Sequence, residues 1–190
     1  MRPWNIFIDP GHSGPVEPGA CNAALGLTEA EVAMNIGLLL WKILTGEGHN
    51  VLFSRGGPID DREIGNRDQL SWRTQKANNW GADLYICLHC NSFGDPAANG
   101  AEALYASGAS QNSMTLAGCI QTELVGLGLT NRGVKEQQLF IRWTDMPAVL
   151  IEHAFVSNPD EAIMLRDRPL DFASADARGI LKYIQGAERA

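Results

Sequence analysis

Three polar side chains stand where apolar segments end, and their types could bind a metal ion or transfer a proton. His12 follows the apolar segment "NIFID" and lies in a loop between Gly11 and Gly14. His89 ends "LYICLH", and Glu152 ends "PAVLIE". Ligands of parallel sheets collect at the carboxyl ends of the strands. We therefore predict that these three side chains share one site.

Each of these residues also has a simpler, structural interpretation. A histidine at a strand end can serve only as a hydrogen-bonded core residue, which is the alternative for His89. Glu152 ends a run that belongs inside the protein, where a carboxylate is costly without a metal or an arginine partner. His153 points to the opposite face of the same strand, so we expect it to lie outside the site. His49, in "GEGHN", is expected to be a solvated loop residue.

The segment "CLHC" around His89 has the residues of a metal motif but not its geometry. Side chains alternate along a strand, so Cys87 and His89 share one face while Cys90 points to the other. We therefore assign both cysteines to the core. The four cysteines are scattered along the chain, and we expect them to be reduced and mostly buried: Cys21, Cys87, Cys90 and Cys119.

The segment "LTEAEVAMNIGLLL" supplies a carboxylate that could complete a metal site. Its apolar residues recur at helical spacing and form the buried stripe of a helix, made by Val32, Ile36, Leu39, Leu40 and Ile43. Glu29 lies about two turns before Ile36 and falls on that stripe. Glu31 lies well round the helix, and with Thr28 it fits a capping box, which gives it a structural role. The predicted inward carboxylate is therefore Glu29.

Two histidines and one inward carboxylate form a three-ligand set with an open position, the arrangement typical of catalytic zinc. We therefore predict that His12, Glu29 and His89 bind one Zn²⁺ ion per chain. Glu152 is then free to act as general base on the attacking water. This assignment accounts for a histidine in a glycine-rich loop.

The elements that must position these residues alternate along the chain. Short segments rich in branched and aromatic residues predict strands at 5–9, 51–54, 84–89, 101–105, 138–142 and 148–152. Amphipathic segments predict helices at 28–46, 66–80, 110–126, 159–166 and 172–187. This alternation favours the α/β class, with a mainly parallel twisted sheet of about six strands and helices on both faces. At 190 residues the chain fits one domain, so we expect 1–190 to form a single catalytic domain.

Composition narrows the possible partners. The net charge of −7 disfavours a nucleic-acid partner, because proteins that bind one present a basic face. No apolar run approaches the length of a membrane span, so we expect no membrane insertion. The first predicted strand begins after four residues, which leaves no room for a signal peptide, and we therefore expect synthesis in the cytoplasm.

Six segments follow one another through nearly the whole chain: "IDPGHSG", "LTEAEVAMNI", "RTQKANNWGADLYICLHCNS", "NGAEALY", "RGVKEQQLFI" and "MPAVLIEHAFVSNPDE". In this order the chain resembles the zinc-dependent N-acetylmuramoyl-L-alanine amidases of the type-3 amidase family, which cleave bacterial peptidoglycan. The resemblance implies zinc ligands at His12, Glu29 and His89 and a catalytic glutamate at Glu152. It also implies hydrolysis of the amide bond between N-acetylmuramic acid and L-alanine, with peptidoglycan as the partner.

Two residues depart from the family pattern, and neither departure removes a ligand. Ser13 stands where the family loop usually has glycine, and His153 stands where a small residue is common. Arg73 lies where the family helix has an arginine, and we expect it to support the fold. The inhibitory helix that regulated members insert before their final strands has no room here, so we expect an open site.

Two other functions fit parts of this pattern. A zinc peptidase that cuts within the stem peptide could use the same ligands and general base. A non-catalytic wall-binding module could use zinc only to hold its fold, but it would not need Glu152 beside three complete ligands. For the amidase we expect a phage-type lysin that reaches the cell wall after holin action, or the catalytic part of a larger protein.

Overall fold

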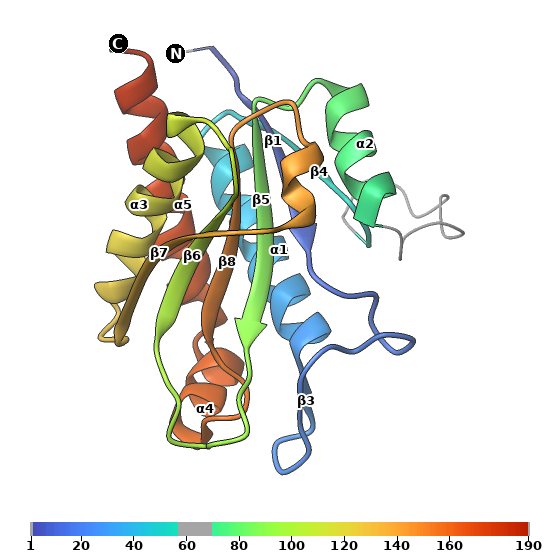
Figure 1. The fold of residues 1–190 in the computed structure, drawn as a ribbon, viewed down its shortest axis with the longest axis vertical. Coiled ribbons are helices and arrows are strands. Elements are labelled where there is room, and N and C mark those ends of the chain that lie inside the picture. Colours follow the sequence, from blue (N-terminus) through green and yellow to red (C-terminus); the bar gives the residue numbers. More distant parts are fainter. Residues whose placement is uncertain (1, 57–69, 190) are drawn as a thin grey trace.

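The computed structural model describes residues 2–56 and 70–189, which fold around a six-stranded sheet (Figure 1). The strands of this sheet are β1 (Asn5–Pro10), β4 (Asn50–Phe53), β5 (Leu84–Asn91), β6 (Ala101–Ala106), β7 (Asn131–Gln137) and β8 (Ala148–Phe155). A small hairpin before the first helix consists of β2 (Cys21–Asn22) and β3 (Leu27–Thr28). The helices are α1 (Glu29–Gly46), α2 (Leu70–Trp80), α3 (Gln111–Val125), the 3₁₀ helix η2 (Phe140–Trp143), α4 (Pro159–Asp167) and α5 (Pro169–Ala187).

The strand order across the sheet is β4-β1-β5-β8-β6-β7. All neighbouring strands pair in parallel except β6 and β8, which are antiparallel. Four strands therefore end at one edge of the sheet, and β6 and β7 begin at that same edge. The predicted class, an α/β fold with a mainly parallel six-stranded sheet, is confirmed.

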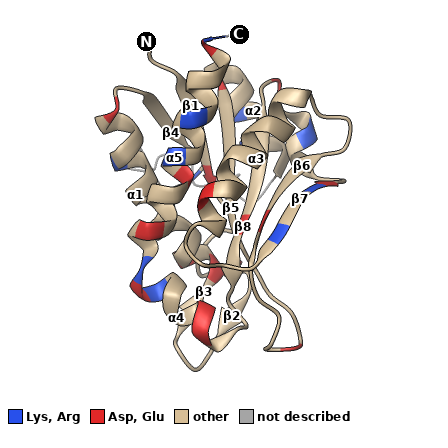
Figure 2. Ribbon diagram, turned by 90° about the vertical axis from the view of Figure 1, so that its left-hand side faces the viewer, with Lys and Arg blue, Asp and Glu red and all other residues tan. Residues whose placement is uncertain are grey.

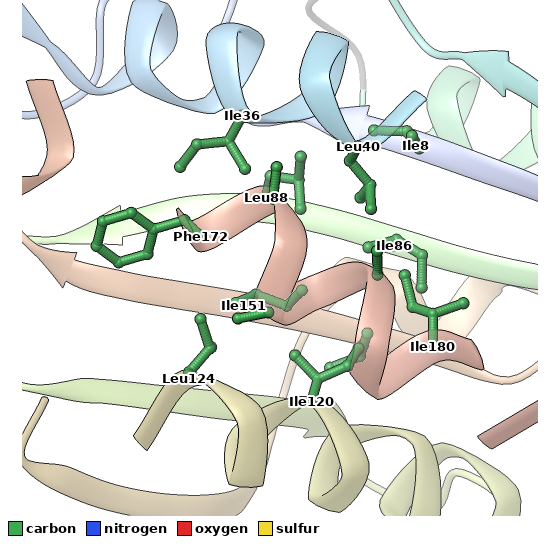
Figure 3. Packing of buried hydrophobic residues seen from close by; sticks show 14 of the residues in the cluster. Ile8, Ile36, Leu40, Ile86, Leu88, Ile120, Leu124, Ile151, Phe172 and Ile180 are labelled. Carbon is green, nitrogen blue, oxygen red and sulfur yellow. The ribbon is translucent and has the colours of Figure 1, made fainter. Parts of the chain in front are cut away.

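Helices cover both faces of the sheet. The larger of the two hydrophobic clusters lies on one face. On that face α1, α3 and α5 pack against alternate strand residues, among them Ile8, Ile86 and Ile151 (Figure 3). Side chains alternate along a strand, so Phe7 and Tyr85 point to the other face, where a smaller cluster joins α2 and η2 to the sheet. None of the described helices has both the length and the apolar character of a membrane span.

Two predictions about local structure are wrong. The strand expected at 138–142 overlaps η2, and the true strand is β7, just before it. β7 lies at the sheet edge, and its sequence "NRGVKEQ" is polar and largely exposed, so it lacks the apolar alternation that marks a half-buried strand. His49 is buried rather than solvated, and its Nδ1 accepts the backbone N–H of Trp4 at 3.3 Å.

The helix predicted at 66–80 and the expected burial of the cysteines are each confirmed only in part. The helix predicted at 66–80 corresponds to α2 from Leu70 onward, and 66–69 lie outside the described residues. All four cysteines are free, and Cys87 and Cys90 are buried as expected. Cys21 is exposed and Cys119 partly so, which corrects the expectation of mostly buried thiols.

Candidate metal centre

The side chains of His12, Glu29 and His89 converge on one point. One ligand atom from each lies within 4.8 Å of the other two, and no other trio of histidine, cysteine, aspartate or glutamate residues does so within 2–56 and 70–189. Glu29 lies between the histidines, with its Oε2 2.9 Å from His12 Nε2 and its Oε1 2.8 Å from His89 Nδ1. Two imidazole nitrogens and a carboxylate therefore form a set that could hold a metal ion.

The fold explains why these three residues meet. His12 follows β1 and His89 lies near the end of β5, the neighbouring parallel strand. Glu29 is the first residue of α1, and its side chain is buried against the sheet. Thr28 caps this helix, since its Oγ1 accepts the backbone N–H of Glu31 at 3.3 Å. The Glu31 carboxylate is exposed and accepts the Thr28 hydroxyl at 2.7 Å, so it points away from the site.

Hydrogen bonds hold the buried carboxylate of Glu29 in its charged form. It accepts the backbone N–H groups of Ala20 at 2.9 Å and Cys90 at 3.0 Å. Burial raises the pKa of Glu29, but the hydrogen bonds from His12 and His89 outweigh this and hold the pKa well below its ordinary value. The hydrogen bond with Glu29 raises the pKa of His12 to about 9. Because a metal ligand must be deprotonated, metal binding here releases a proton and weakens as the pH falls.

Several contacts outside the ligand set fix His12. Its backbone φ of +63° is unusual for a residue other than glycine, so neighbouring groups must hold it. Its Nδ1 lies 2.5 Å from Glu17 Oε1, a contact that leaves Nε2 for a metal. Arg73 donates to the His12 carbonyl at 2.6 Å, and Arg55 donates to the Gly11 carbonyl at 2.6 Å. Sequence reasoning missed Glu17 and Arg55. Glu17 lies in the loop after β1, away from any strand end or helical stripe, whereas Arg55 lies two residues after β4, and this position at a strand end is the signal that could have found it.

Arg73 has the structural role expected for it, and this role extends to the site. Its guanidinium lies 2.7 Å from Asp9 Oδ1, with both groups buried, and donates to the Pro10 carbonyl at 3.0 Å. The Tyr85 hydroxyl donates to Asp9 Oδ2 at 2.5 Å. Removing one partner of a buried ion pair leaves an uncompensated charge and is strongly destabilising. Arg73 therefore ties α2 to the loop that carries His12.

Two glycines leave room for the converging side chains. A Cβ atom at Gly11 would lie 2.4 Å from the ring of His89. A Cβ atom at Gly19, where φ is +70°, would lie 2.5 Å from the ring of His12 and 2.6 Å from the carboxylate of Glu29. The backbone is thus shaped around these three side chains. This cradle and its two-nitrogen, one-oxygen donor set fit a zinc ion.

Glu152 lies beside the ligand set without belonging to it. It is on β8, in register with His89 of β5, and it is not part of the trio of mutually close ligand atoms. Its Oε2 is buried and has no hydrogen-bond partner, and no arginine pairs with it among the described residues. Burial raises the pKa of Glu152 to about 8, supported by the charges of Glu29 and Glu102 and opposed by that of His12.

The residues excluded by strand alternation do lie outside the site. His153 is fully buried on the far side of β8, with its Nδ1 3.0 Å from the His89 carbonyl and its Nε2 2.8 Å from Asp176 Oδ2. Cys87 belongs to the core on the α2 side of the sheet, and Cys90 belongs to the core on the α1 side. Neither cysteine contributes to the trio of converging ligand atoms.

Comparison with known proteins identifies close relatives. Residues 6–182 match the N-acetylmuramoyl-L-alanine amidase family. The sporulation-specific N-acetylmuramoyl-L-alanine amidase of Bacillus subtilis is 34% identical over 189 residues, which cover 97% of this chain and 67% of that protein. The endolysin of Bacillus phage SPP1 is 29% identical over 189 residues, which cover 94% of this chain and 65% of that protein. The chain thus spans about two thirds of the length of these two relatives.

A solved structure shares the whole fold. The catalytic domain of CwlV, an N-acetylmuramoyl-L-alanine amidase from Bacillus (Paenibacillus) polymyxa var. colistinus, superposes with a TM-score of 0.83. The match covers 96% of this chain and 98% of that domain at 28% sequence identity. The six-stranded sheet with its helices is therefore the architecture of an amidase catalytic domain.

Glu29 and Glu31 form a matched pair for testing the site, because they lie two residues apart in the same helix turn. Glu29→Ala removes the anionic group between the histidines, so the protein should retain almost no metal after dialysis against Zn²⁺. Glu31→Ala weakens only the helix cap, so it should keep its full metal content and lose on the order of 1 kcal/mol of stability. Elemental analysis gives the metal content, and circular dichroism verifies the fold. Metal loss in Glu31→Ala with retention in Glu29→Ala would contradict the ligand set.

Proposed function

This chain belongs to the N-acetylmuramoyl-L-alanine amidase family, and we propose that it is a zinc hydrolase that cleaves the amide bond between N-acetylmuramic acid and L-alanine in peptidoglycan. One observation carries the proposal: the convergence of His12, Glu29 and His89 beside Glu152 at the ends of neighbouring strands. The proposal treats the chain as one catalytic domain that acts on the cell wall. The similarity to an endolysin supports phage-type release as its route to the wall.

His12, Glu29 and His89 would hold one zinc ion through two imidazole nitrogens and a carboxylate. Three protein ligands of this kind are typical of catalytic rather than structural zinc sites. When bound, zinc supplies a Lewis acid that polarises the amide carbonyl and promotes ionisation of the attacking water. The chain contributes the fixed positions of the ligands, through the Glu17 contact and the arginine contacts to the loop.

Glu152 would carry the proton. Amide hydrolysis requires that the attacking water lose a proton and that the leaving nitrogen gain one. The buried Oε2 of Glu152 has no partner among the described residues, so it is free to accept the proton and then return it. Burial raises the pKa of this carboxyl and favours the return, whereas a nearby cation lowers the pKa and favours the carboxylate that accepts first.

Digestion of purified peptidoglycan tests this function against cleavage within the stem peptide. The amidase should release intact stem peptides with a free N-terminal L-alanine, as read by mass spectrometry and N-terminal labelling. A strong chelator should abolish release, and added zinc should restore it. Peptides that begin at an internal residue would refute amidase activity, and release after complete metal removal would refute the zinc assignment.

Glu152→Gln tests the proton carrier. The amide keeps nearly the shape of the carboxylate but cannot accept a proton, so kcat should fall by roughly 10²–10⁴-fold. Metal content should stay at the wild-type level, because Glu152 lies outside the ligand set. Glu31→Gln, an exposed change on α1, is the control and should keep its activity. Loss of metal from Glu152→Gln would mean that Glu152 is a ligand.

The same variant reveals the raised pKa of Glu152. In chelator-treated protein, the folded state keeps the Glu152 proton up to about pH 8, whereas an ordinary glutamate loses it near 4.5. Between these values only the folded state binds the proton, so stability falls as the pH rises through this window. As the pH is raised from about 5 to about 8, the free energy of unfolding of the wild-type protein should therefore fall by more than that of Glu152→Gln. Urea unfolding of both proteins across this range measures the difference. Parallel curves for the two proteins would show that the pKa is not raised.

A further inference from the structure

A charged cluster lies next to Glu152 on the same face of the sheet. Glu102, on β6, is the register partner of Glu152, and directly opposed residues of paired strands point to the same face. Glu102 Oε1 accepts a hydrogen bond from Asn91 at 2.7 Å, and its Oε2 pairs with the ammonium group of Lys135 on β7. The Nε atom of Arg132, also on β7, lies 3.7 Å from the same oxygen. Lys135 and Arg132 are called the basic pair below.

The basic pair keeps one positive charge that Glu102 does not neutralise, since two cations face one carboxylate. The Lys135 side chain is 46% exposed and that of Arg132 is 35% exposed, while Glu102 is only 11% exposed. Both residues belong to β7, at the edge of the sheet, and Figure 2 shows blue for Lys and Arg along this strand. The ring of Phe155, 4.9 Å from the Arg132 guanidinium, fixes that group in place. An ammonium group has three N–H donors, so the Lys135 contact with Glu102 leaves capacity for another acceptor.

The position of the proton carrier sets the direction of the leaving group. Glu152 returns its proton to the nitrogen of L-alanine, so that nitrogen must lie within hydrogen-bonding reach of Glu152. The candidate metal ligands lie on the β5 side of β8, and β6 and β7 lie on its other side. The acyl group therefore lies over β5, and the nitrogen with its peptide extends over β6 toward β7.

The distances match the second residue of the stem peptide. Neighbouring strands are about 4.8 Å apart, which puts β7 about 10 Å from β8. An extended residue spans about 3.5 Å, so L-alanine and the next residue together cover about 7 Å from Glu152. The side chains of the basic pair reach from β7 back to Glu102 on β6 and thereby meet this second residue. That residue is D-isoglutamate, which has a free α-carboxylate, or its amide, D-isoglutamine.

Resting on the proposed amidase activity, we propose that Lys135 and Arg132 bind the α-carboxylate of the second stem residue and select for peptides in which it is free. Hydrogen bonds from cations to a carboxylate are stronger than those to a neutral amide, which gives the pair a basis for discrimination. Glu102 acts as a positioning residue, because it draws both cations to the β8 side of β7. This positive charge reduces the repulsion that Glu102 and Glu152 exert on an anionic peptide.

Two synthetic muramoyl tripeptides that differ only in this carboxylate or carboxamide test the proposal. Zinc-loaded wild-type enzyme should show a kcat/KM about tenfold higher on the carboxylate substrate, as expected for one charge-assisted hydrogen bond in a partly exposed site. Lys135→Met should remove the preference by slowing the carboxylate substrate alone, and Lys135→Arg should restore it. Lys42→Met removes the same charge from an exposed position on α1 and should keep the preference.

A second variant separates selection from folding. Lys135→Met leaves Glu102 with less compensating charge, whereas Glu102→Gln/Arg132→Met/Lys135→Met removes the carboxylate and both cations together, so it leaves no uncompensated charge and should also show no preference while it stays folded. Equal kcat/KM on the two substrates by wild-type enzyme would overturn the subsite, as would equal slowing of both by Lys135→Met. Failure of wild-type enzyme to release the tripeptide, with its free N-terminal L-alanine, from either substrate would instead refute the amidase activity itself.

Discussion

The buried carboxylate of Glu29 is the interaction on which the site depends. It lies at the N-terminus of α1, where the helix dipole favours negative charge, and it accepts backbone N–H groups from Ala20 and Cys90. A buried carboxylate without such partners costs several kcal/mol. The loop after β1, the start of α1 and the end of β5 must therefore come together for the chain to fold. The contacts that stabilise the fold also bring His12 and His89 to one point.

The strand order divides the work of the site across one face of the sheet. The loop after β1 and the end of β5 carry the histidines of the candidate metal centre, β8 carries Glu152, the proposed proton carrier, and β6 and β7 carry charges that suit the proposed leaving peptide. The antiparallel pairing of β6 with β8 is essential to this order, because it starts β6 at the edge where β8 ends. Glu102 thereby lies directly beside Glu152. A parallel β6 would place its first residues at the opposite edge of the sheet.

Much of the fold and the site could be predicted from the spacing of residues along the chain. Helical periodicity separates Glu29 from Glu31, since only one of them falls on the buried stripe, and the structure places them accordingly. β7 could not be predicted, because this edge strand is exposed along most of its length and therefore shows no apolar alternation. The burial of His49 and the contacts of Arg55 likewise join segments distant in sequence, and no local pattern encodes them.

Anomalous diffraction at the zinc absorption edge, from crystals loaded with one equivalent of Zn²⁺, tests the central claim most directly. The account predicts one strong peak at about 2.0–2.2 Å from His12 Nε2, His89 Nδ1 and a Glu29 oxygen, with Glu152 beyond coordination distance. A peak coordinated by Glu152 or by a cysteine thiolate instead of Glu29 would contradict it.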